Sequence, residues 1–243
     1  MHCSSTLRWS PTWILFLSIF SCQAYAASEP DSGVIVIGFV GGRVHHDNVV
    51  HKEVQLAARL RSEYPTGMRA EIFENHQGRQ ALAAVLKLLD CDHNGTLSEA
   101  EKRAARIVLY GHSWGASEAV TLARSLQKDG VPVLLTIQVD SVSKLGEDDR
   151  LIPANVAQAV NFYQLDGLLH GQSKILAMDS ARTKILGNFR FDYKTNPVRL
   201  DGFPWYAQLF MKPHIEIESD PQVWNQVESL IRSELPPARA ETQ

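Results

Sequence analysis

A serine flanked by glycines stands near the middle of the chain. Residues 111–115 read Gly-His-Ser-Trp-Gly, which matches the pattern G-x-S-x-G. The apolar run 106–111 predicts a strand before the serine, and residues 115–128 predict a helix after it. A sharp turn from strand to helix exposes a serine hydroxyl, and it needs flanking glycines because side chains there would collide with neighbouring backbone. The pattern therefore predicts that Ser113 is a nucleophile.

A serine nucleophile needs a general base, and histidine is the usual one. His214 follows Ser113 in the chain and lies just before a predicted C-terminal helix. His170 is the alternative base. His112 is excluded because the turn beside Ser113 fixes its side chain. We expect His214 to be the base.

The base in turn needs a carboxylate to orient its ring. Asp140 ends the apolar run 132–139, so its side chain would emerge at the carboxyl edge of the sheet. Asp166 and Asp179 end later runs and remain open as alternatives. We favour Asp140 because its strand is better formed and its loop is short.

An acidic loop predicts a calcium site. Residues 90–101 read Asp-Cys-Asp-His-Asn-Gly-Thr-Leu-Ser-Glu-Ala-Glu, which matches D-x-[DN]-x-[DN]-G-x5-E at every defined position and resembles the EF-hand family. The predicted ligands are Asp90, Asp92, Asn94, Thr96, Ser98 and Glu101. An unpaired extracellular site is expected to bind Ca²⁺ with a Kd of about 10⁻⁴ M. Our hypothesis is that the ion braces the entry to the strand before Ser113.

We assign no catalytic or metal-binding role to two other groups of reactive side chains. Cys91 lies inside the acidic loop, which opposes thiolate formation, so we assign it no catalytic role. His45 and His46 are adjacent, but the sequence shows no third ligand spaced to join them. We expect them to be solvated or to form a wall of the substrate pocket.

The elements that must position these residues alternate between strand and helix. Apolar runs without polar interruption predict strands buried on both faces, and periodic apolar stripes predict helices. The expected strands are 33–38, 69–73, 106–111, 132–139, about 159–165 and one within 173–191; the expected helices are 48–64, 80–89, 115–128 and one after Asp220. This alternation predicts an α/β fold with a mostly parallel sheet and helices on both faces.

The sequence resembles the α/β-hydrolase superfamily, specifically its secreted lipase- and esterase-like members. The resemblance rests on residues 111–115, on the turn Gly38-Phe39-Val40-Gly41-Gly42, and on the chain order serine, acid, histidine. It implies an oxyanion hole made by the backbone N–H groups of Phe39 and Trp114, although Ile37 stands where the family often has histidine. It also implies that the sheet is trimmed at its N-terminal edge.

The N-terminal segment 1–26 has the features of an export signal. Arg8 precedes the apolar run 13–20, which is too short to span a bilayer, and Ala24-Tyr25-Ala26 offers a cleavage site. We expect a secreted or periplasmic protein, with residues 27–243 forming a single domain that contains the calcium loop. A lipid anchor at Cys22 is a less favoured alternative, because residues 19–22 only loosely resemble a lipobox.

The composition is that of an ordinary globular protein. The chain has 243 residues, 44% of them hydrophobic, and a formal net charge of −3. This charge gives no support for nucleic-acid binding. We predict an exported serine hydrolase that cleaves small-molecule or lipid carboxylic esters. A thioesterase and a non-catalytic, calcium-stabilised binding protein are the alternatives, and segment 141–155 is expected to be a solvated loop rather than a lid.

Overall fold

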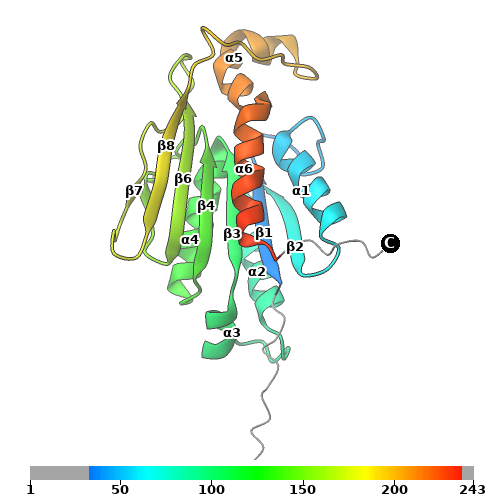
Figure 1. Ribbon diagram of the computed structural model, residues 1–243, viewed down its shortest axis with the longest axis vertical. Coiled ribbons are helices and arrows are strands. Elements are labelled where there is room, and N and C mark those ends of the chain that lie inside the picture. Colours follow the sequence, from blue (N-terminus) through cyan, green and yellow to red (C-terminus); the bar gives the residue numbers. More distant parts are fainter. Residues whose placement is uncertain (1–32, 237–243) are drawn as a thin grey trace, which may run out of the picture.

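A parallel β-sheet forms the centre of the molecule. The computed structural model describes residues 33–236. The sheet has six strands, and every neighbouring pair is parallel. In spatial order they are β2 (Met68–Glu74), β1 (Val34–Val40), β3 (Ile107–His112), β4 (Val133–Val139), β6 (Val156–Gln164) and β8 (Lys184–Phe191) (Figure 1). A separate short pair joins β5 (Leu151–Ile152) to β7 (Leu176–Ala177).

Helices cover both faces of this sheet. One core lies between the sheet and the helices α1 (Lys52–Glu63) and α6 (Pro221–Glu234), and the other lies under α2 (Gly78–Leu89) and α4 (Trp114–Lys128). Two further helices, α3 (Glu99–Ala104) and α5 (Trp205–Ser219), lie at opposite ends of the strands (Figure 1). The predicted α/β class, with a parallel sheet covered on both faces, is confirmed.

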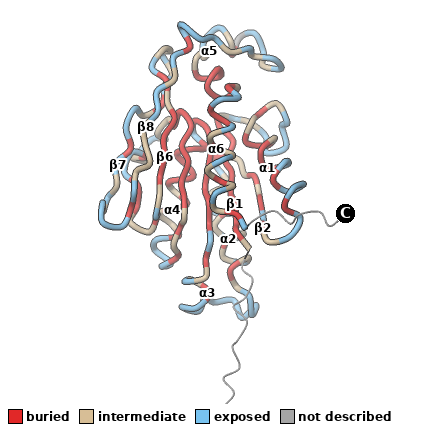
Figure 2. Tube along the Cα trace, in the orientation of Figure 1, coloured by how far each residue is buried: buried red, intermediate tan, exposed pale blue. Residues whose placement is uncertain are grey.

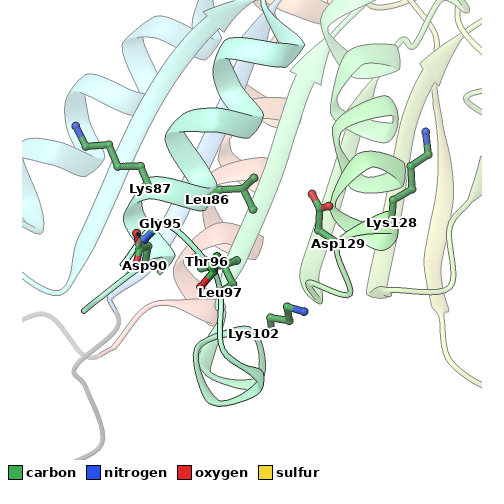
Figure 3. A pocket seen from close by; sticks show the side chains of 9 residues that line it. All are labelled: Leu86, Lys87, Asp90, Gly95, Thr96, Leu97, Lys102, Lys128 and Asp129. Carbon is green, nitrogen blue, oxygen red and sulfur yellow. Dashed lines mark hydrogen bonds between the residues drawn. The ribbon is translucent and has the colours of Figure 1, made fainter. Parts of the chain in front are cut away.

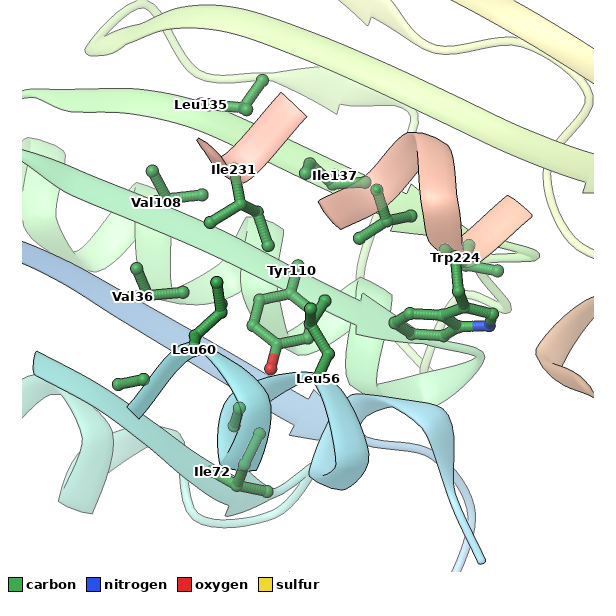
Figure 4. Close-up of a cluster of buried hydrophobic side chains, with 14 of the residues drawn as sticks. Val36, Leu56, Leu60, Ile72, Val108, Tyr110, Leu135, Ile137, Trp224 and Ile231 are labelled. Carbon is green, nitrogen blue, oxygen red and sulfur yellow. The ribbon is translucent and has the colours of Figure 1, made fainter. Parts of the chain in front are cut away.

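The apolar runs of the sequence are explained by these two cores. In β1, Val34 and Val36 face one core, while Ile35 and Ile37 face the other. All seven residues of β1 are buried (Figure 2). Figure 4 shows the first core, where Tyr110 packs among aliphatic side chains from both the sheet and the helices. Full burial of one such aliphatic side chain stabilises the fold by roughly 1.5–3 kcal/mol.

A helix that the sequence analysis did not predict precedes the last one. His214 lies just before α6, as expected, but within α5, whose backbone is kinked at Met211 (φ −129°). Pro213 follows this kink, so it stands in the first turn of the second half of the helix. Proline is tolerated there because its missing N–H would have no intrahelical partner.

Several predictions concern residues outside the described range. The export signal 1–26, the possible anchor at Cys22 and the chain end after residue 236 all lie there. Within residues 33–236, none of the helices combines the length and the apolar character needed to cross a bilayer.

Candidate active site

Three side chains that the sequence singled out meet at the carboxyl ends of the strands. The Nε2 atom of His214 lies 2.9 Å from Oγ of Ser113, and its Nδ1 atom lies 2.6 Å from Oδ2 of Asp140. Ser113 directly follows β3, Asp140 directly follows β4, and α5 supplies His214. All three residues are buried. The arrangement is a hydrogen-bonded chain from hydroxyl to imidazole to carboxylate.

The serine lies on a strained turn. Its backbone has φ 57° and ψ −126°, a conformation that L-residues rarely adopt. A backbone hydrogen bond of 2.9 Å from Ser113 N to Val139 O holds it in place. A Cβ at Gly111 would lie 2.6 Å from the carbonyl of Gly115, and one at Gly115 would collide with the carbonyl oxygen of Phe39. Both glycines are therefore sterically required.

Asp140 is held by more than the histidine. Its carboxylate also accepts hydrogen bonds from Nε2 of Gln164 at 2.8 Å and from the backbone N of Gly171 at 2.7 Å. Burial by itself would raise the pKa of the Asp140 carboxyl, but the hydrogen bond and charge of His214, with these further donors, hold that pKa below its usual range. Asp140 is therefore ionised at neutral pH. Sequence reasoning missed Gln164 and Gly171, because nothing local marks them.

The alternative candidates have other partners. Asp166 accepts a hydrogen bond from the backbone N of Tyr193 at 2.7 Å, and Asp179 accepts one from that of Ala181 at 2.9 Å. Nδ1 of His170 lies 3.1 Å from the carbonyl oxygen of Gly171, and its side chain is exposed. The structure therefore places Asp140 and His214, rather than these residues, beside Ser113.

A cavity of about 630 Å³ opens over Ser113. Trp114 lies on its wall and is 41% exposed. Much of the opposite wall is apolar and comes from α5 and the residues just before it, namely Phe203, Pro204, Ala207 and Met211. The cavity can hold a small organic molecule against the serine hydroxyl.

The structure does not place Phe39 at this cavity. Phe39 is fully buried inside β1, in register with Phe73 and Gly111 of the neighbouring strands. The strand was expected to end at residue 38 but continues to Val40, so the turn falls two residues later. Gly41 and Gly42 line the cavity instead, and a Cβ at Gly41 would lie 3.0 Å from Cβ of Ser113.

Buried polar side chains also surround the Ser113–His214–Asp140 chain. Nε2 of His112 lies 3.1 Å from the carbonyl oxygen of His214, and the ring centroids of the two histidines are 4.5 Å apart. Nδ1 of His112 lies 3.3 Å from Glu218, which also forms a hydrogen bond with Nδ1 of His51. The sequence offered one unused signal for Glu218, its alternation with isoleucine in the run Ile215-Glu216-Ile217-Glu218.

Segment 141–155 and the paired histidines differ from expectation. Asp149 is fully buried and accepts hydrogen bonds from Ser141 and Ser143, so part of the segment is anchored, while Leu145 is fully exposed as expected of a solvated loop. His45 and His46 do have a third candidate ligand, because Glu74 brings a carboxylate oxygen within 4.8 Å of their ring nitrogens. The sequence could not show this because the strand β2 supplies Glu74.

The acidic loop lies at the far end of the sheet. Carboxylate oxygens of Asp90, Asp92 and Glu101 are within 4.8 Å of one another. They accept hydrogen bonds from backbone N–H groups, such as the 2.8 Å bond from Cys91 N to Glu101. Figure 3 shows the loop beside the C-terminal end of α4. Ca²⁺ binds oxygens at 2.3–2.6 Å, so oxygens on opposite sides of the ion lie about 5 Å apart, and this spacing fits.

Comparison with known proteins gives limited results. No family model and no curated protein matches this sequence. Among solved structures, two of acetyl xylan esterase are 13% and 14% identical, cover 84% of this chain and 99% of their own, and have a TM-score of 0.40. The RedJ thioesterase of prodiginine biosynthesis from Streptomyces coelicolor is 12% identical, with 83% and 90% covered and a TM-score of 0.36. Any functional assignment therefore depends on the site itself.

Proposed function

We propose that the protein is a serine hydrolase that cleaves carboxylic esters through an acyl-enzyme. The observation that supports this most directly is the hydrogen-bonded chain Ser113–His214–Asp140 at the edge of an open cavity. A strained serine, an imidazole and a buried carboxylate in this order form a nucleophile, its base and the group that orients the base.

In the proposed reaction, Oγ of Ser113 attacks the ester carbonyl while Nε2 of His214 takes the hydroxyl proton. Asp140 accepts the Nδ1–H of His214, which leaves Nε2 free as the base and stabilises the imidazolium that forms. The imidazolium then gives its proton to the leaving alcohol, and an acyl-serine remains. Water attacks this ester by the same route in reverse, releasing the acid and restoring Ser113.

The oxyanion of the tetrahedral intermediate needs hydrogen-bond donors. The first is the backbone N–H of Trp114, which follows the nucleophile at the start of α4. For the second we propose the backbone at Gly41–Gly42, in place of the expected Phe39, because these residues lie at the cavity beside Ser113. The apolar wall from α5 would contact the acyl or alcohol part of the substrate.

An active-site-directed probe tests the proposal. A fluorophosphonate should label the wild-type chain and the control His170→Ala, whose side chain is exposed and outside the hydrogen-bonded chain. It should fail to label Ser113→Ala and should label His214→Ala much more slowly. Labelling that survives Ser113→Ala would show that Ser113 is not the nucleophile, whereas no labelling of the wild type would support the alternative of a non-catalytic binding protein.

A panel of p-nitrophenyl esters and matched acyl thioesters then distinguishes ester from thioester hydrolysis. The same three residues would serve both, because only the leaving group differs. We expect higher kcat/KM for the oxygen esters. Preference for the thioesters would retain the mechanism and change the substrate class.

We also propose that the acidic loop binds a structural Ca²⁺ ion. Its ligands would be side-chain oxygens of Asp90, Asp92, Asn94 and Glu101, the carbonyl of Thr96, and Ser98 directly or through water. The clustering of the three carboxylates supports this proposal. The ion would hold the loop that leads through α3 into β3, the strand that ends at the serine.

A further inference from the structure

Three ionisable side chains converge next to the catalytic residues. His51 is the N-cap residue of α1, Glu53 lies in the first turn of that helix, and Glu218 lies in the last turn of α5. All three are buried, and one nitrogen or oxygen atom from each lies within 4.8 Å of the others. His51 and Glu218 also line the catalytic cavity, so the group has access to solvent through it.

The carboxylate of Glu53 has no hydrogen bond of standard geometry among the described residues, although the backbone N–H groups of Glu53 and Gly41 lie near it. The residue is 0% exposed. Burying an unpaired polar group is unfavourable, and burying an ionised carboxylate is more so. A second carboxylate, that of Glu218, lies beside it. The group therefore lacks either a proton or a cation.

Glu218 also contacts a second histidine. Nδ1 of His112 lies 3.3 Å from a carboxylate oxygen of Glu218, and Nε2 of the same ring lies 3.1 Å from the carbonyl oxygen of His214. The carboxylate of Glu218 therefore lies between His51 and His112, next to that of Glu53.

We propose that His51, Glu53 and Glu218 bind a Zn²⁺ ion beside the active site. Two carboxylates would balance the double charge, and a histidine with carboxylates is a ligand set that Zn²⁺ accepts. Tetrahedral Zn²⁺ places its ligand atoms about 3.4 Å apart, so the three side chains need only small shifts. The fourth position would face the cavity.

The hydrogen bond between His51 and Glu218 bears on how the ion binds. Zn²⁺ needs an unprotonated imidazole nitrogen, so it would displace the proton that these two residues share. The ion would then link the start of α1 to the end of α5. Glu218 lies one helical turn after His214, so this link would fix the helix that carries the catalytic base. The site does not depend on the proposed esterase activity.

The other two clusters of potential ligands within residues 33–236 are different in kind. His45, His46 and Glu74 are mostly exposed, and Asp90, Asp92 and Glu101 offer only oxygen, which suits Ca²⁺. A variant in each of these clusters therefore serves as a control for the buried one.

Metal titration of the whole chain tests the proposal. The wild-type protein is dialysed against chelator, supplied with Ca²⁺ to fill the acidic loop, and titrated with Co²⁺ as a coloured substitute for Zn²⁺. We expect the visible absorption of tetrahedral Co²⁺ to saturate at one ion per chain and to be displaced by Zn²⁺. Absence of saturable uptake at micromolar metal would overturn the proposal, whatever the variants show.

Variants then locate the ion. Glu53→Gln keeps the shape of the side chain but removes its charge, and we expect it and His51→Ala to weaken Co²⁺ binding by about 100-fold or more, above the upper range seen for residues that only orient ligands. His46→Ala and Asp92→Asn should bind Co²⁺ as the wild type does. Uptake that persists in Glu53→Gln, or that is lost in His46→Ala, would overturn the assignment. Circular dichroism verifies that each variant is folded, and the wild-type titration decides if one is not.

Discussion

At the scale of single residues, hydrogen-bond partners distinguish side chains of the same type. Asp140, Asp166 and Asp179 all follow apolar runs, yet the structure places only Asp140 of these three against His214. Its carboxylate is fixed by donors on both sides, so it can orient the imidazole without reorganising. The roles proposed for these residues can be tested by removing one charge at a time.

Replacing Asp140 should remove most of the activity. In Asp140→Asn the amide cannot accept from Nδ1–H as the carboxylate does, so His214 loses its correct tautomer and kcat should fall by roughly 10⁴-fold. Asp179→Asn is the matched control, since Asp179 is half-buried and bonds to Ala181, outside the hydrogen-bonded chain of the site. Ester hydrolysis by both variants is compared with the wild type. If Asp179→Asn loses activity while Asp140→Asn retains it, the proposed acid is wrong.

The lowered pKa of Asp140 predicts a pH-dependent contribution to stability. Because the folded-state pKa lies below the unfolded value of about 3.9, the ionised carboxylate stabilises the fold above that value. This contribution is lost as pH falls through the folded-state pKa. The unfolding free energies of the wild type and Asp140→Asn are compared by guanidinium unfolding at several pH values. Their difference should be roughly constant from about pH 5 to 7 and should shrink below about pH 4. A difference that does not change with pH would contradict the assigned shift.

At the scale of elements, the β3–α4 turn depends on close backbone approach. Gly115, in the first turn of α4, packs against the carbonyl of Phe39 in β1. The kink in α5 has a comparable effect at the other side of the site, because it turns the second half of that helix so that His214 faces Ser113.

Enlarging Gly115 should be much more costly than enlarging another glycine near the same helix. Gly115→Ala would force α4 away from β1, and we expect a loss of about 3 kcal/mol or more together with loss of activity. Gly130, just after α4, has φ 72° but open space, so Gly130→Ala should cost about 1 kcal/mol and leave activity intact. Chemical unfolding and ester hydrolysis measure both effects. Equal losses in the two variants would show that packing against β1 is unimportant.

At the scale of the whole molecule, the proposed catalytic site and the proposed calcium site lie at opposite ends of the sheet. The acidic loop and α3 lie at the end where β3 begins, and Ser113 lies where it ends (Figure 1). A calcium ion there is too far from the substrate to take part in catalysis. Our earlier hypothesis that it braces β3 therefore predicts an effect on stability.

Calcium should raise thermal stability more than it raises activity. At a Ca²⁺ concentration 100 times its Kd, binding to the folded state alone adds about 2.7 kcal/mol, which is several degrees in Tm for a domain of this size. The melting temperature is measured with Ca²⁺, with chelator, and with Mg²⁺ as a control for ionic strength. Asp92→Asn should reduce the shift. Equal melting temperatures with calcium and chelator would remove the calcium site from the proposal.

The sequence by itself determined the elements and the class of fold. Apolar runs such as 132–139 indicate strands buried on both faces because period and burial are local properties of the chain, and residues 111–115 indicate the turn because its glycines are sterically required. The length of β1 was mispredicted and the helix α5 was not predicted, because register with β2 and β3 and packing of α5 override local signals.

Only the tertiary structure decided which distant side chains meet. His214 is 101 positions from Ser113, and Glu218 is 167 positions from His51, so no spacing rule connects them. Gln164 at the end of β6 and Gly171 in the loop after it orient Asp140. Glu53 is buried beside Glu218, although a charged residue at a helix start is usually solvated. These contacts arise because parallel strands bring their carboxyl ends to one edge, where loops from the whole chain converge.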